Sequence, residues 1–376
     1  MQYIPGEVLS KLLFREMSCS RWGKIVILSS LLIVFTAAAL VFTVDPHYRY
    51  RMPSFYELVY YKPYATAPRL LKSFDYDTLF MGSSMTRNFY LSDIDRTLGG
   101  KSLKLSAAGA TPADLKKFLD IARKAKGEKL KRVFYSLDTY ALNKTAPCYS
   151  EFDYLYREDF KEEYRYLFSR QSYSSIYYLL KRKLRPRGKR QFQTDPDKMF
   201  STEYPGMKFG WLPIMKEAAQ NELIHNTQTP ANPPAFERSL KEYLLPMVKE
   251  NPGIRFYFYL APSHIYTYCQ SEQFREADDL IKQRTRVMKE LIKFPNVKLY
   301  DYQADRSIVC TPGFFSDIRH FGSEGARMIL KKLSCTERQL RNETEISANE
   351  KELRSLIKEQ MPVYFADLKK YKERKK

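Results

Sequence analysis

The residues best suited to do chemistry together are a serine near the start of the chain and an aspartate–histidine pair near its end. Ser84 lies in FDYDTLFMGSSMTRNF (residues 74–89), just after an apolar run that ends in Gly82, while Asp317 and His320 are spaced D-x-x-H in FSDIRHF. A carboxylate one turn from an imidazole can orient it and stabilise its charged form. A serine hydroxyl needs such a base for attack at neutral pH, so the set favours acyl transfer.

The chain has only 4 histidines, which limits the choice of base. His264, in APSHIY, is the rival, but no carboxylate is close to it in sequence. We therefore predict His320 as the general base and Asp317 as its orienting group. The backbone amides of Ser84 and Gly109 are the predicted oxyanion donors, because both follow strand-like runs whose ends would share one crevice.

Other interpretations of the serine turn remain open. Ser84 could be a helix N-cap. A Gly-Ser-Ser turn before a helix could also bind phosphate through its amides, although residues 82–89 lack the pattern G-x-x-x-x-G-K-[ST]. Arg87, in the first helical turn, is a candidate contact for an anionic substrate group, or an ordinary solvated arginine.

Strand-like and helix-like segments alternate along the chain. Helical spacing with a capping-type start marks residues 111–127 and 276–294. The strand-like runs are 76–82, 102–107, 131–138, 254–261 and 296–301. This alternation predicts an α/β fold, a three-layer sandwich in which a five-stranded parallel sheet is covered on both faces.

MGSSMTRNF, the glycine after the second strand-like run, and DIRHF resemble the SGNH (GDSL-like) hydrolase superfamily over roughly residues 74–335. The order of these blocks also matches. The chain resembles the membrane-anchored extracytoplasmic bacterial branch, which includes D-alanyl-lipoteichoic-acid transfer proteins and polysaccharide O-acetyltransferases. The resemblance implies a flavodoxin-like sheet, Ser84 as nucleophile, Gly109 in the oxyanion hole, and His320 with Asp317. It also implies a membrane-bound acyltransferase partner.

The third block departs from the family pattern. Ser83 stands where relatives have Asp, and LDTYALN replaces G-x-N-D, so that Asp138 takes the place of the glycine and Tyr140 that of the oxyanion asparagine. This puts the three-donor oxyanion hole in doubt, unless Asn143 or another segment supplies a donor.

The run from Ile25 to Val44 contains no charge and is long enough to cross a bilayer as a helix. We predict a signal anchor at 25–44; cleavage near the alanines at 37–39 is the alternative. Basic residues before the run favour a cytoplasmic segment 1–24 and an extracytoplasmic remainder, which makes a single-pass protein of the cell membrane.

The rest of the chain divides by composition. We predict a Pro- and Tyr-rich stalk at 45–73, the SGNH-like domain at 74–335 with an insertion at about 150–240, and a charged helical tail at 336–376. The insertion, with its basic run at 181–190, either lies over the carboxyl ends of the strands or is a surface excursion. Four cysteines lie after the anchor and allow two disulfides or free thiols, namely Cys148, Cys269, Cys310 and Cys335.

Lys and Arg number 63 against 43 acidic residues, a net charge of +20, which favours anionic partners. No nucleic-acid motif accompanies the charge, and no metal site or cofactor is predicted. The sequence predicts a serine esterase or O-acyltransferase acting on an acylated envelope polysaccharide or teichoic-acid-like polymer. The alternative is a non-catalytic module of the same fold that binds an anionic envelope glycopolymer.

Overall fold

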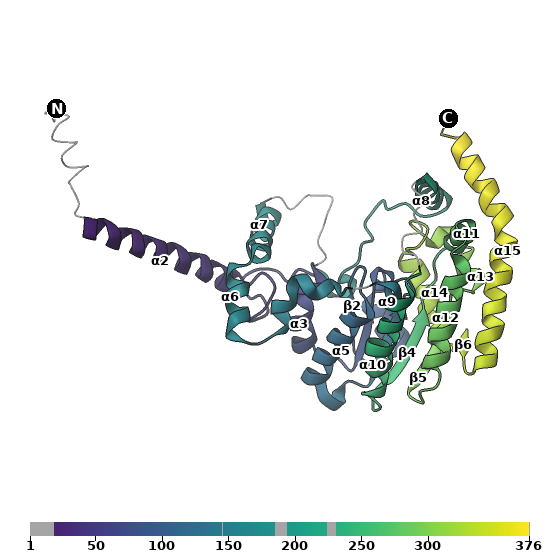
Figure 1. The fold of residues 1–376 in the computed structure, drawn as a ribbon, viewed down its shortest axis with the longest axis horizontal. Helices are drawn as coiled ribbons and strands as arrows, with labels where there is room; N and C mark the ends of the chain where they lie inside the picture. Colours follow the sequence, from purple (N-terminus) through teal and green to yellow (C-terminus); the bar gives the residue numbers. More distant parts are fainter. Residues whose placement is uncertain (1–18, 145, 185–193, 224–230, 376) are drawn as a thin grey trace. The chain divides into compact units, whose positions relative to one another are not determined.

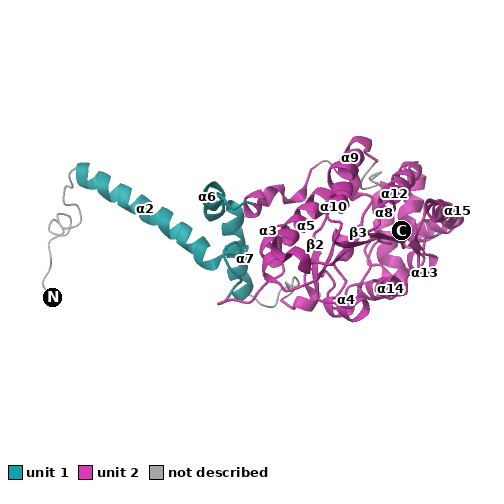
Figure 2. Ribbon diagram, turned by 90° about the horizontal axis from the view of Figure 1, so that it is seen from below, with its two compact units in different colours: residues 1–53, 157–187 teal, residues 54–156, 188–376 magenta. Residues whose placement is uncertain are grey.

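The structure, a computed structural model, describes residues 19–144, 146–184, 194–223 and 231–375. The chain forms two compact units, coloured separately in Figure 2. Unit 1 comprises Met1–Pro53 and Arg157–Arg187, and unit 2 comprises Ser54–Tyr156 and Gly188–Lys376. Most of the predicted segment 1–24, and residues 185–190 of the basic run, lie outside the described residues.

Unit 2 is an α/β structure around one sheet with strand order β2-β1-β3-β4-β5-β6 (Figure 1). The first five strands are mutually parallel and coincide with the five predicted runs. The prediction of a five-stranded parallel sheet is nevertheless wrong, because β6 pairs antiparallel with β5 and makes the sheet mixed. The strands are β1 (Thr78–Gly82), β2 (Ser102–Ser106), β3 (Arg132–Leu137), β4 (Arg255–Leu260), β5 (Val297–Asp301) and β6 (Gln339–Leu340).

Helices cover both faces of the sheet, as its nearly continuous burial requires. Figure 2 shows α3, α5, α10 and α12 on one side of the strands and α4 and α14 on the other. The helices of unit 2 are α3 (Pro63–Ser73), α4 (Leu91–Leu98), α5 (Pro112–Lys126), α8 (Trp211–Leu223), α9 (Pro233–Arg238), α10 (Leu245–Lys249), α11 (Tyr266–Gln273), α12 (Ala277–Leu291), α13 (Arg306–Val309), α14 (Ser323–Ser334) and α15 (Glu343–Glu373). Shorter helical turns are η1 (Ser84–Thr86), η2 (Gly127–Lys129), η3 (Ala141–Asn143), η4 (Cys148–Tyr156), η5 (Pro196–Lys198), η6 (Ser239–Leu244) and η7 (Pro312–Phe314).

Helix α5 begins and ends where its sequence predicts. Thr111 and Asp114 form a capping box, Pro112 occupies the first turn, and basic residues fill the last turn before Gly127. These local signals determine where the helix after β2 begins. They therefore also determine the length of the turn at residues 107–110, which contains Gly109.

Helix α15 packs on the domain along one side. Ile346, Leu353 and Tyr364 are buried in it. A buried ion pair between Arg284 of α12 and Asp301 of β5 lies beneath it, and Arg284 Nη2 also donates to Asn349 Oδ1 of α15 (2.6 Å). The predicted charged tail therefore contributes a buried face to unit 2.

Unit 1 joins α2 (Cys19–Val44) to a helical pair, α6 (Phe160–Phe168) and α7 (Arg170–Leu184). The carboxylate of Asp45, just after α2, accepts hydrogen bonds from the amides of Arg49, Tyr50 and Arg51 and from the Tyr166 hydroxyl of α6 (2.7–2.9 Å). Among the described residues α2 is the one helix long and apolar enough to cross a membrane, which fits a single-pass anchor or a signal sequence.

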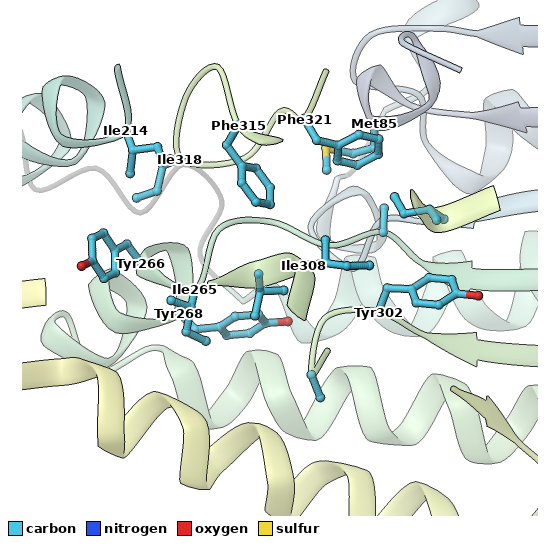
Figure 3. Packing of buried hydrophobic residues seen from close by; sticks show 14 of the residues in the cluster. Met85, Ile214, Ile265, Tyr266, Tyr268, Tyr302, Ile308, Phe315, Ile318 and Phe321 are labelled. Carbon is cyan, nitrogen blue, oxygen red and sulfur yellow. The ribbon is translucent and has the colours of Figure 1, made fainter. Parts of the chain in front are cut away.

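One hydrophobic cluster of unit 2 lies under two segments that are far apart in sequence. Met85 comes from the turn after β1, whereas Phe315, Ile318 and Phe321 come from the loop before α14 (Figure 3). Phe89 also meets Phe321 edge-on at 5.8 Å between ring centroids. Shared burial of these side chains holds the two segments together.

Candidate active site

The turn after β1 depends on the absence of a side chain at Gly82. A Cβ there would meet Ser136 Cβ and Thr86 Cγ2 at 2.6 Å, too close for either atom to accommodate. The strand can therefore run close to β3 and turn at once into η1. Ser84 is the first residue of that turn and is partly exposed.

Ser83 stabilises this turn through hydrogen bonds of its buried hydroxyl. Its hydroxyl donates to Asp138 Oδ2 (3.2 Å) and accepts from the Met85 amide (3.4 Å). The Thr86 hydroxyl contacts both the Ser83 carbonyl (2.9 Å) and Ser106 Oγ (2.7 Å). Ser83 is buried, so Ser84 is the serine of this pair whose side chain reaches the surface.

Asp317 and His320 form a tight turn before α14. Asp317 Oδ1 accepts from the amides of Arg319 (2.8 Å) and His320 (2.6 Å), and its Oδ2 lies 2.8 Å from His320 Nδ1. Burial alone would raise the pKa of Asp317, but the hydrogen bonds from the ring and amide of His320 and from the Arg319 amide outweigh it, and the pKa is lowered. Asp317 is therefore ionised at neutral pH.

The structure brings the serine and the histidine into contact: Ser84 Oγ lies 2.8 Å from His320 Nε2. An ionised Asp317 accepts the Nδ1 proton of the ring, which leaves Nε2 as the acceptor for the Ser84 hydroxyl. Hydroxyl, imidazole and carboxylate then form one continuous hydrogen-bonded chain. This arrangement can remove a proton from Ser84 and store it on the ring.

Gly109 lies in the neighbouring turn. The Ala107 amide donates to the Gly82 carbonyl (3.1 Å), so the ends of β1 and β2 are adjacent. Gly109 itself has a φ of +70°, a conformation that favours glycine. Within the described ranges, the amides of Ser84 and Gly109 donate to no protein acceptor, which leaves both available to an oxyanion.

The other predicted site residues have different surroundings. Asn143 is buried, and its side chain is used by Thr139 O, Gln283 Oε1 and the Asn232 amide. These contacts leave no obvious donor for an oxyanion. His264 is buried between the rings of Tyr266 and Phe315, and burial lowers its pKa to about 4.

Three cationic side chains belong to the segments that carry the site residues. Arg87 follows Ser84 by one turn, burial lowers the pKa of its guanidinium, and its Nε is buried with no hydrogen-bond partner in the described part of the chain. Lys144 Nζ donates to the Gly109 carbonyl (3.0 Å). The Arg319 guanidinium lies over the ring of Tyr140, 5.1 Å from its centroid.

Several supporting residues were not predicted from the sequence. Asn88 Nδ2 donates to the Phe321 carbonyl (2.8 Å), and Lys104 Nζ donates to the carbonyls of Arg87 (2.8 Å) and Phe89 (2.5 Å). Lys104 is fully buried, and burial lowers its pKa to about 7. The lone lysine inside the second strand-like run, SLKLSA, was the available signal.

The insertion also supports the histidine loop. Glu203 accepts hydrogen bonds from the amide (2.7 Å) and hydroxyl (3.2 Å) of Ser323, and Glu217 accepts one from the Ile318 amide (3.1 Å). A Cβ at Gly322 would meet the Phe209 ring at 2.5 Å. This part of the insertion thus packs against the loop, whereas residues 157–187 belong to unit 1.

All five cysteines are free thiols in the structure, including the four that could have formed two disulfides. Within the described residues, no group of three or more His, Cys, Asp or Glu side chains is arranged to hold a metal ion.

No protein-family model and no curated protein matches the chain. Among solved structures, it is similar to one from Streptococcus pneumonia described as a candidate platelet activating factor, with 10% identity and a TM-score of 0.35. The match covers 74% of this chain and 91% of that one. So distant a likeness is no basis for assigning an activity, and the chemistry rests on the side chains themselves.

Proposed function

We propose that this protein is a membrane-anchored serine esterase or O-acyltransferase. The observation that carries the proposal is the chain of 2.8 Å contacts from Ser84 Oγ to His320 Nε2 and from His320 Nδ1 to Asp317 Oδ2. Serine, imidazole and carboxylate in this order form the machinery of covalent acyl transfer. The Ser83–Asp138 contact and the Gly82 close approach support it by fixing where the Ser84 hydroxyl points.

The first half-reaction forms an ester on Ser84. Its Oγ attacks the carbonyl carbon of an acyl ester while its proton passes to His320 Nε2. The negative charge that develops on the carbonyl oxygen is stabilised by the amides of Ser84 and Gly109. The bond to the leaving alkoxide then breaks, and the alkoxide takes the proton from His320.

The second half-reaction returns the enzyme to its starting state. Water, or a hydroxyl of a polymer, loses its proton to His320 and attacks the acyl carbon. The bond to Ser84 breaks, and Ser84 Oγ recovers the proton. Water as acceptor gives an esterase, and a polymer hydroxyl gives a transferase.

The proposed substrate is an acyl ester of an anionic cell-envelope polymer, a polysaccharide or a teichoic-acid-like chain. The unpartnered guanidinium Nε of Arg87 and the ammonium of Lys144, which bonds to the Gly109 carbonyl, support an anionic group near the ester. The length and apolar character of α2 support confinement to a membrane surface. We propose that the remainder of the chain lies outside the cytoplasm, because basic residues precede the apolar run. A membrane-bound acyltransferase is a further proposed partner at that surface.

A second function, binding of an anionic glycopolymer without catalysis, is favoured by one observation. Asn143, the nearest asparagine to the third-strand turn, is fully engaged in structural hydrogen bonds, so the oxyanion would have two backbone donors and no amide side chain.

Labelling with a serine-reactive fluorophosphonate separates the two functions. We expect labelling of the wild type and of Ser83→Ala, and none of Ser84→Ala. Equal labelling of wild type and Ser84→Ala would overturn the covalent mechanism. Hydrolysis of an acetyl ester should fall far more in His320→Ala than in His264→Ala, and the reverse order would move the base to His264. Protease treatment of intact cells tests the topology, and a protected C-terminal domain would contradict it.

A further inference from the structure

Helix α2 is solvent-exposed over most of its length and packs against other helices of unit 1 at its C-terminal end. Its side chains are exposed without interruption from Cys19 to Thr36. After that, Ala37–Ala39 are half-buried and Val41 is fully buried, while Leu40, Phe42 and Thr43 stay exposed on the other side of the helix. Both views show α6 and α7 beside this covered end within unit 1 (Figures 1 and 2). The two helices therefore cover one side of the last turns of α2.

The part of α2 that is exposed on all sides is too short to cross a bilayer alone. Its uncharged portion, residues 25–36, rises only about 18 Å at about 1.5 Å per residue, against a hydrocarbon core about 30 Å thick. The uncharged run continues to Val44. A membrane crossed by α2 must therefore reach the level at which α6 and α7 cover the helix.

The two helices that contact this end of α2 also present large apolar side chains to the outside. On α6, Phe160 is 88% exposed and Tyr164, one turn later, is 63% exposed. On α7, Tyr177 is 66% exposed and Leu180 is 54% exposed. These residues leave much apolar surface uncovered in a helical pair of 9 and 15 residues.

Cationic side chains of unit 1 lie close to aromatic rings and to the end of α2. Lys181 Nζ lies 6.0 Å from the Tyr177 ring centroid, and Lys183 is also exposed on α7. Arg51 Nη2 donates to the Phe42 (2.8 Å) and Thr43 (3.0 Å) carbonyls at the end of α2. Aromatic rings beside cationic side chains at the end of an apolar helix are typical of the membrane–water boundary.

We propose that the outward faces of α6 and α7 form a membrane-interface surface, composed of Phe160, Tyr164, Tyr177 and Leu180. Its partner is the headgroup and upper acyl region of the bilayer that α2 crosses, with Lys181 and Lys183 favouring anionic lipids. The surface depends on retention of α2 in the membrane and not on the chemistry at Ser84. Contact between this surface and the lipid headgroups would set how deeply α2 is inserted in the bilayer.

The test uses tryptophan fluorescence of the full-length protein in vesicles of phosphatidylcholine and phosphatidylglycerol. In a Trp22→Phe/Trp211→Phe background, Phe160→Trp and Tyr177→Trp each place one probe on the surface. Ile33→Trp in α2 and Phe365→Trp on α15 are the controls, both exposed in the structure. The lipids carry bromine either near the headgroup or deep in the acyl chain, and circular dichroism verifies that each variant is folded.

We expect Phe160→Trp and Tyr177→Trp to lose more fluorescence with shallow bromine than with deep bromine, and Ile33→Trp to show the opposite. Phe365→Trp should lose little. Absence of quenching at both surface probes, with Ile33→Trp still quenched, would overturn the proposal. A blue-shifted emission without quenching would also overturn it, in favour of a protein partner or a second copy. Equal quenching of Phe365→Trp would indicate non-specific adsorption and count against it.

Discussion

The side-chain amide of Asn88 donates to the backbone carbonyl of Phe321 at 2.8 Å, and so ties the turn that carries Ser84 to the loop that carries His320. Its carbonyl oxygen accepts from Ser201 Oγ (3.1 Å), which brings the insertion into the same connection. Because Asn88 lies four residues after Ser84 and Phe321 directly follows His320, this hydrogen bond acts with the shared hydrophobic cluster to set the spacing of hydroxyl and imidazole.

Asn88→Ala should lower kcat for ester hydrolysis by roughly 10- to 100-fold with little change in KM, because small displacements of reacting groups are costly in rate. Ester kinetics at saturating substrate check this. Ser92→Ala, which loses only an exposed contact to Asp197, is the matched control. An Asn88→Ala enzyme with the wild-type kcat would show that the tether does not position the site.

Lys104→Met should change how stability depends on pH. Burial lowers the pKa of Lys104 from 10.5 to about 7, so between these values the unfolded chain binds a proton that the folded chain does not. The contribution of Lys104 to the free energy of unfolding is therefore fully present above about pH 10, and is lost progressively as the pH falls from about 10 to about 7.

Urea denaturation of wild type and Lys104→Met at pH 7 and pH 9.5 measures this contribution. The difference in stability should move in favour of the wild type as the pH rises. Lys129 is exposed and pairs with Asp75, and Lys129→Met is the control. Its difference in stability from the wild type should not rise with pH. A pH-independent difference for Lys104→Met would mean that the lysine keeps its ordinary pKa in the fold.

Arg87→Gln tests whether the substrate carries an anion near the ester. Loss of the guanidinium should raise KM for an anionic acyl ester about tenfold, equivalent to about 1.4 kcal/mol, and leave KM for a neutral ester unchanged. Arg96→Gln removes an arginine with an exposed side chain from α4 and serves as the control. Equal effects on both esters would assign Arg87 to the structure of the turn.

Arg284→Met should destabilise unit 2 by about 3–5 kcal/mol, because it leaves the carboxylate of Asp301 buried without its partner. Replacing both, as Arg284→Met/Asp301→Leu, should recover part of that loss. Arg306→Met breaks an exposed pair with Glu359 and should cost no more than about 1 kcal/mol. Similar losses of stability in Arg284→Met and Arg306→Met would show that burial of the Arg284–Asp301 pair does not raise the cost of breaking it.

The five parallel strands could be predicted because each is a short apolar run bounded by turn signals. The run 254–261, for example, contains all of β4. β6 could not, since Gln339 and Leu340 are strand residues only because β5 offers a free edge. A strand of two residues is too short to show the alternation of apolar and polar residues that predicts a strand. Its pairing with β5 depends on where α14 ends.

The candidate site was accessible to sequence reasoning to the extent that its members lie at strand ends or share a local spacing. Ser84 follows β1, and Asp317 and His320 form a local turn; the structure brings the three into hydrogen-bonding contact. Asn88 and Glu203 could not be recognised, because their partners are 233 and 120 residues away. Contacts at such separations leave no local pattern.

The contact between Ser84 and His320 spans 236 residues of chain, which has a consequence for the time at which the proposed activity could begin. At a synthesis rate of about 5–20 residues per second, Ser84 exists for roughly 10–50 s before His320 is made. During that interval the nascent chain carries a serine without a base. A chain cut short anywhere in the insertion lacks His320, so under the proposed mechanism it would be inert.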